Sequence, residues 1–230
     1  ACASHGDYFR GVFDKISTNL ADEDFTGMKA RWKTARYGGY ACLDLVLPAV
    51  KFTITTRRRQ TEVNYRIVAP HGIDGSCSNT VIYGGLESYC ANGQIIGEYD
   101  ILRRKNSSGF RLEDFLERLQ RSKNDFLNHG NRLQTWASKE TNRDRVEEAV
   151  SELMGKRKAA DMLAVYDNEA EDRGDNVYSL YSAMTNYSSH DGGTFPLRKT
   201  KRDNAAITMM NREHEVARWV RSDAFLRLAA

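Results

Sequence analysis

The chain has 230 residues, of which 40% are hydrophobic and 28% are charged, and its formal net charge is +3. These values are typical of a soluble globular protein with a sizeable core. No uncharged apolar run approaches the roughly 18 residues that a membrane span needs, which excludes a transmembrane protein. Because the net charge is small, any binding of a polyanion must depend on local clusters of cations.

The cysteines indicate a reducing compartment. Cys2, Cys42, Cys77 and Cys90 form no C-x-x-C pair and follow no signal-peptide pattern. We therefore expect reduced thiols and a location in the cytoplasm of a host cell. The first residue is not Met, so a preceding piece can be missing.

The N-terminal part predicts one helix. From Ser4, a candidate cap, to Leu20, apolar residues recur every four positions, as is typical of a helix over residues 4–20. The period then changes to two, because Met28, Ala30 and Trp32 alternate with cations. One face of this strand is therefore expected to be apolar and the other basic.

Further strands are expected along the first half of the chain. The alternation predicts strands at 40–47 (ending at Pro48), 50–55, 63–67, 79–87 and 94–103. The link at 57–60 is short enough for a hairpin, and Asn92-Gly93 is a strong hairpin turn signal.

After Gly109 the apolar period returns to 3.6 and predicts helices. The first is expected to start at Leu112 and end near His129-Gly130, with Leu133 and Trp136 extending it after a break. Further helices are expected around 146–153, 162–166, 177–187 and 203–228, the last one capped by Asp203.

This order of elements predicts an α+β fold. Residues 1–109 are expected to form a helix and a mostly antiparallel sheet. Residues 110–230 are expected to form a helical region, packed on the sheet or on a neighbouring subunit.

Three segments resemble a family of phage- and plasmid-borne proteins that is known as a domain of unknown function, the phage/plasmid-like protein family. The first segment is Tyr37-Gly38-Gly39-Tyr40, which leads into the apolar strand 43–48. The second is 64–75, followed by Tyr89-Cys90-Ala91-Asn92-Gly93, and the third is 177–190. Two departures stand out: Gly72-Ile73 separates His71 from Asp74, which are adjacent in the family, and Ser182 replaces an Asn.

The resemblance implies a protein of a phage or other mobile element, with a role in replication, recombination or defence evasion. A basic hairpin in a sheet, followed by helices, is also similar in topology to the ring-forming single-strand annealing proteins of phage recombination, an analogy at the level of the fold.

Clusters of cations are the candidate contacts to nucleic acid. Cations that follow a sheet can bind phosphates along a strand, and nearby aromatic rings can stack on bases. The candidate phosphate contacts are Lys29, Arg31, Lys33, Lys51, Arg57, Arg58, Arg59, Arg66, Arg103, Arg104, Lys105, Arg198, Lys199, Lys201 and Arg202. The candidate stacking residues are Trp32, Tyr37, Tyr40 and Tyr65. Charged strand faces also serve simply to prevent sheet edges from pairing.

His71 with Asp74, and His190 with Asp191, suggest a metal site, but they lie in Gly-rich turns where Asp is expected for backbone reasons. No motif has a clear metal-ligand spacing, and no P-loop or G-x-G-x-x-G is present. We therefore expect no catalytic residue, no metal and no cofactor.

The leading hypothesis is a non-enzymatic homo-oligomer that binds single-stranded DNA and assists annealing in recombination or replication. The alternative is a protein-binding inhibitor of a host defence or takeover target. The third hypothesis, a metal-dependent nuclease that acts through His71, Asp74 and His190, is the least favoured.

Overall fold

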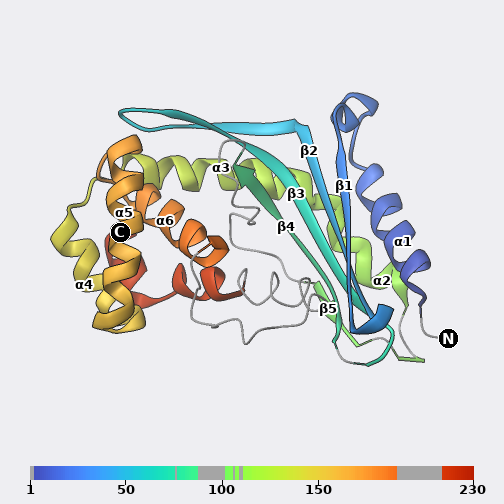
Figure 1. Cartoon of the computed structure of the whole chain (residues 1–230). Helices are drawn as coiled ribbons and strands as arrows, with labels where there is room; N and C mark the ends of the chain where they lie inside the picture. Colours follow the sequence, from blue (N-terminus) through green and yellow to red (C-terminus); the bar gives the residue numbers. More distant parts are fainter. Residues whose placement is uncertain (1–2, 76, 88–101, 106, 109–110, 191–213) are drawn as a thin grey trace.

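The computed structural model describes residues 3–75, 77–87, 102–105, 107–108, 111–190 and 214–230. The fold is α+β, as the sequence predicts: a helix and an antiparallel sheet precede a helical C-terminal half (Figure 1). None of the described helices combines the length and the hydropathy that crossing a bilayer requires.

The elements follow the chain in simple order. In the described part of the chain, the sheet has five antiparallel strands in the order β1-β2-β3-β4-β5. The strands are β1 (Lys29–Ala35), β2 (Tyr40–Thr55), β3 (Gln60–Gly72), β4 (Asn79–Glu87) and β5 (Leu102–Arg104). The helices are α1 (His5–Ser17), α2 (Leu112–Leu116), α3 (Ser122–Ser138), α4 (Arg143–Met154), α5 (Lys156–Arg173), α6 (Val177–His190) and α8 (Asp223–Ala229).

Helix α1 begins where the sequence predicts. The side chain of Ser4 accepts a hydrogen bond from the backbone N–H of Asp7 at 3.1 Å, which caps the first turn. The residues at helical spacing, Tyr8, Val12 and Ile16, are buried in the main core. This predicted helix is therefore confirmed, together with its cap.

Strand β2 corrects the prediction of two strands separated at Pro48. It is one strand of 16 residues, and its register against β3 shifts between Leu47 and Lys51. Such an irregularity leaves ladder positions unpaired, so a proline without an N–H can be accommodated there.

The register assigns the residues of the sheet to two faces. Residues of β2 and β3 such as Ala41, Leu45 and Ile67 belong to the main core, on the face that α1 and α3 cover. The opposite face carries a smaller cluster with Cys42 and Val68 at its centre. Because side chains alternate along a strand, the pairing register alone decides which face a residue occupies.

Helix α3 corrects the predicted break near His129-Gly130. The interruption lies earlier, in the 3₁₀ turn Glu117–Arg121, and α3 then runs unbroken to Ser138. Gly130 is explained by packing, because a Cβ at this position would lie 2.8 Å from Cγ of Phe52 on β2. The glycine lets the helix lie close against the sheet.

The C-terminal helix is interrupted where the sequence predicts continuity. Residues 214–219 are helical, and a turn precedes α8, whose N-cap is Ser222. The expected cap Asp203 lies outside the described residues, as do the Asn92-Gly93 turn and most of the strand predicted at 94–103.

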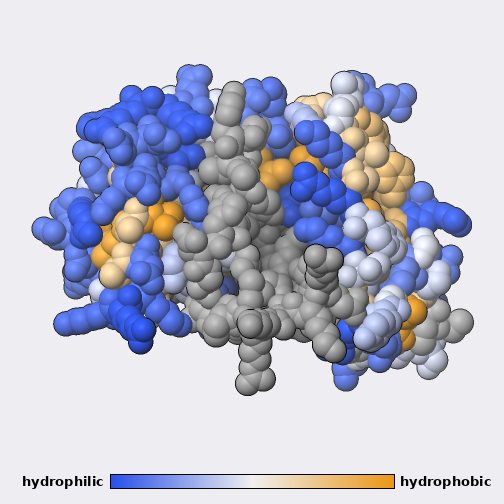
Figure 2. Space-filling model, viewed as in Figure 1, coloured by the Kyte–Doolittle hydropathy of each residue, from blue (hydrophilic) through white to orange (hydrophobic). Residues whose placement is uncertain are grey.

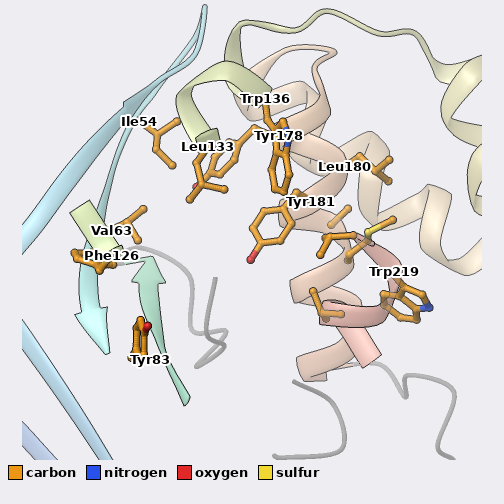
Figure 3. Close-up of a cluster of buried hydrophobic side chains, with 14 of the residues drawn as sticks. Ile54, Val63, Tyr83, Phe126, Leu133, Trp136, Tyr178, Leu180, Tyr181 and Trp219 are labelled. Atoms are coloured by element: carbon orange, nitrogen blue, oxygen red, sulfur yellow. The ribbon is translucent and has the colours of Figure 1, made fainter. Parts of the chain in front are cut away.

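One hydrophobic core joins the sheet to the helices. It contains Ile54 and Val63 of the sheet and continues through Leu133 and Trp136 of α3 to Tyr181 of α6 (Figure 3). The rings of Trp136 and Tyr181 lie 5.4 Å apart. Helix α3 therefore packs on the sheet on one side and on the C-terminal helices on the other.

The tip of the β2–β3 hairpin extends beyond the rest of the sheet and reaches the end of α5 (Figure 1). There Nη1 of Arg58 donates to the carbonyl oxygens of Ala170 and Glu171, at 3.3 and 2.8 Å. These carbonyls belong to the last turn of α5, where the helix dipole favours a cation.

The two arginines beside Arg58 also contact acidic residues of the helical half. Arg57 pairs with Glu140, and Arg59 pairs with Asp172 at 3.1 Å. The triplet at 57–59, a leading candidate for phosphate contact in the sequence, is therefore placed by the structure where the hairpin docks on the helices.

We expect Arg58→Ala to lower the free energy of unfolding by about 1 kcal/mol, since it removes two charge-assisted hydrogen bonds at a helix end. Arg57→Ala is the matched control: the Arg57 side chain is 81% exposed and its ion pair should contribute less than about 0.5 kcal/mol. Denaturant unfolding of both variants measures the difference, and equal losses would contradict the docking role of Arg58.

Candidate nucleic-acid interface

Three cations share one face of the edge strand β1. Lys29 and Arg31 are exposed and Lys33 is half-buried, and all three lie at alternate positions of the strand. Alternate residues of a strand are separated by about 7 Å. We call Lys29, Arg31 and Lys33 the β1 basic strip; the predicted basic face of this strand is present.

The acidic residue nearest to the strip in register is already neutralised. Asp44 of β2 lies directly opposite Arg31, but it is buried and accepts hydrogen bonds from Nε and Nη2 of Arg66 at 2.7 and 3.1 Å. The Asp44 carboxylate therefore does not cancel the charge of the strip. Figure 2 shows hydrophilic residues over this part of the sheet.

The same ion pair corrects the interpretation of Arg66 as a phosphate contact. Its side chain is 2% exposed, so no phosphate can reach the guanidinium. Lys51 is exposed but pairs across the strands with Glu62 at 2.6 Å. The continuous basic groove expected from the sequence is therefore reduced to the β1 basic strip.

Two of the four predicted stacking residues are inaccessible. Tyr40 and Tyr65 are buried, and the hydroxyl of Tyr65 is hydrogen-bonded to Ser122 of α3. Burial raises the pKa of both phenols well above its ordinary value, so both stay protonated. They are core residues and cannot stack on bases.

The other two aromatic residues are at the surface. Trp32 is 52% exposed, but it alternates with the basic strip and lies on the other face of β1, with its ring 4.6 Å from that of Phe9. Tyr37 is 97% exposed and follows β1 directly, in the turn Arg36–Gly38. Of the four predicted residues, Tyr37 is the best placed beside the strip.

His71 is part of the core and not of a metal site with Asp74. It is buried, its ring stacks on that of Tyr8 at 4.5 Å, and its Nδ1 lies 2.7 Å from Nδ1 of His5. Desolvation, reinforced by His5, lowers the pKa of His71 to about 4. Asp74 instead lies against Gly39 and Arg36.

The described residues provide no metal-binding cluster that would support the nuclease hypothesis. Among the residues that the structure describes, no three His, Cys, Asp or Glu side chains converge as metal ligands. His190 ends α6, and its side chain lies outside what the structure describes, as does Asp191.

The remaining predicted cations are far from the strip in topology or lie outside the described residues. Arg103 and Arg104 are on β5, the opposite edge of the sheet from β1, and Lys105 follows them as an exposed residue. Arg198, Lys199, Lys201 and Arg202 are outside the described residues. The structure therefore does not bring the basic clusters at 57–59 and 103–105 together on one surface.

Sequence reasoning missed a further basic cluster. Lys156 and Arg157 are exposed and Lys158 is half-buried at the start of α5, in the helical half. The run of three consecutive cations was the available signal. These residues provide a comparison surface with the same charge as the β1 basic strip.

The third family-like segment, 177–190, forms a buried helix with an internal polar network. Ser182 and Asn186 of α6 donate to the carboxylate of Glu169 on α5 at 2.9 and 3.1 Å, and Arg173 pairs with the same group. Ser182 therefore contributes to the packing of α5 against α6.

Comparison of the chain with protein-family models, with curated proteins and with solved structures finds no match. The resemblance to the phage/plasmid-like family therefore remains a prediction that depends on the quoted motifs.

We expect Asp44→Ala to lower the free energy of unfolding by about 3 to 5 kcal/mol, because it leaves the Arg66 guanidinium buried without its counter-ion. Replacing both partners, as in Asp44→Leu with Arg66→Met, should recover most of this loss. Denaturant unfolding measures both. A single variant as stable as the wild type would return Arg66 to the list of surface cations.

Acid should destabilise the protein through His71. Between pH 6.5 and 4 the unfolded chain binds a proton that the folded His71 does not, so the free energy of unfolding falls as the pH falls through this window. The effect reaches at most about 3 kcal/mol. The stability gap between the wild type and His71→Gln should therefore narrow on acidification.

Denaturant unfolding at a series of pH values tests this expectation. A constant gap between the wild type and His71→Gln over this pH range would contradict the buried neutral state of His71.

Proposed function

We propose that the protein binds single-stranded nucleic acid through the β1 basic strip. The observation that carries the proposal is the set of three cations at alternate positions on the exposed edge strand, beside a buried Asp44 whose charge Arg66 already neutralises. Spaced cations on an extended strand can follow an extended phosphate backbone.

The role of edge lysines in preventing strand pairing is the competing explanation. It accounts for cations on β1 but requires no ligand. The two explanations differ in what happens to nucleic-acid affinity when the strip is removed.

The biological part of the proposal is supported by the sequence resemblance. On this basis we propose that the ligand is DNA of a phage or other mobile element. We propose that a homo-oligomer anneals this DNA in recombination or replication. Mass measurement by light scattering, with and without oligonucleotide, tests the assembly: a defined large oligomer supports annealing, and a monomer contradicts it.

We expect the triple variant Lys29→Ala, Arg31→Ala, Lys33→Ala to bind a labelled single-stranded oligonucleotide more weakly than the wild type. Each phosphate contact contributes about 0.7 to the slope of log K against log salt for single strands. Removal of three contacts should therefore reduce the magnitude of this slope by about 2. Fluorescence anisotropy over a salt series measures both quantities.

The control is the triple alanine variant of Lys156, Arg157 and Lys158, which changes the net charge equally in the helical half. It should keep the slope of the wild type. Equal losses in both variants would indicate binding by overall charge, and no loss in a folded strip variant would overturn the proposal. A protein that binds no oligonucleotide would favour the alternative, a protein-binding inhibitor.

A further inference from the structure

The turn between β1 and β2 holds an unfavourable backbone conformation. Arg36, Tyr37 and Gly38 all have positive φ, at 52°, 54° and 88°. Only glycine adopts this region without penalty, and each non-glycine residue there costs on the order of 1–3 kcal/mol. Such strain persists only where surrounding contacts enforce it.

Contacts from two other segments, α1 and residues 73–74, hold the turn in place. Nε2 of His5 on α1 lies 2.8 Å from the carbonyl oxygen of Gly38, which fixes this nitrogen as the donor. The N–H of Ile73 donates to the carbonyl oxygen of Gly39 at 2.9 Å. Asp74 packs so closely on Gly39 that a Cβ there would lie 2.8 Å from its carboxylate.

The strained turn presents a large aromatic ring to solvent. At 97% exposure Tyr37 buries almost no area, so its ring gives the fold almost no hydrophobic stabilisation in return for the strain. Arg36 beside it is half-exposed, 4.0 Å from Asp74. An exposed tyrosine ring on a turn whose backbone is held in place, with a cation beside it, suits a flat ligand.

Tyr37 lies where a strand bound along the β1 basic strip would leave β1. It follows Lys33, the last cation of the strip, by four residues, and the turn begins directly after Ala35 ends β1. A nucleobase is the flat group that an extended strand carries at this point. Only an unpaired base offers its face to a protein ring, since paired bases are stacked inside a duplex.

We infer that Tyr37 stacks on an unpaired base and gives the site its preference for single strands over duplexes. The inference rests on the proposed function, because the β1 basic strip supplies the phosphate contacts that bring the base to Tyr37. His5 and Asp74 act as positioning residues that hold the turn.

Tyr37→Ala should weaken binding of a single-stranded oligonucleotide by about 5- to 150-fold, the range of one base–aromatic stack. It should leave the salt slope and the affinity for a duplex of the same sequence unchanged. Tyr37→Phe keeps the ring and should bind as the wild type does. An oligonucleotide of abasic sites should bind equally well to the wild type and to Tyr37→Ala.

Tyr37→Gly adds a signature that a purely structural role cannot produce. Glycine relieves the positive φ, so the midpoint of unfolding should rise while the affinity for single strands falls as in Tyr37→Ala. A variant that loses both stability and affinity would show that the ring supports the fold, and would overturn the inference.

The outcomes separate the inference from the proposed function. If Tyr37→Ala binds single strands as the wild type does, while the strip variant loses affinity and salt dependence, the stacking role is wrong and the binding role stands. If Tyr37→Ala reduces duplex and single-strand binding equally, the preference for unpaired bases is wrong. If the wild type binds neither ligand, both proposals are wrong.

Discussion

The pairing register between β2 and β3 is the constraint on which the other features of the sheet depend. A slip of one residue would reverse the faces of one strand relative to the other. Asp44 and Arg66 would then lie on opposite faces, with one of the two charges in the main core under the helices. In the observed register these two residues meet on the opposite face, where each neutralises the other. Leu45 and Ile67, one position away, then complete the core that α1 and α3 cover.

The irregularity between Leu47 and Lys51 lets this pairing continue to the hairpin tip. Without it, Pro48 would end the strand and the tip would not reach α5. The extended hairpin is therefore both a part of the sheet and the arm that fastens the sheet to the helical half. The sheet and the helical half are therefore joined twice: inside the molecule by the hydrophobic core in Figure 3, and at the surface by the contacts of Arg58.

The cations of the N-terminal half serve three different physical purposes. Arg66 is buried in an ion pair, Arg58 binds the end of a helix, and Lys29 and Arg31 face solvent on an edge strand. In the sequence all of them are simply cations next to strands. Because some of these cations are buried or bound to a helix end, the basic surface is smaller than the sequence suggests. The exposed ring of Tyr37 lies at the end of this surface.

The α+β order, the cap at Ser4, the basic and apolar faces of β1 and most helix positions could be predicted from local sequence patterns. These follow from the periodicity of neighbouring residues and from local hydrogen bonds, which short stretches of chain specify. The break predicted near His129-Gly130 and the end of a strand predicted at Pro48 were wrong. Gly130 packs against Phe52 of β2, and a shift in register against β3 accommodates Pro48, so contacts with distant residues override the local signals. Which of these cations remain at the surface depends on long-range contacts, because the partners of Arg66 and Arg58 lie 22 and up to 113 positions away along the chain. Such pairings depend on register and on helix docking, which no local pattern encodes.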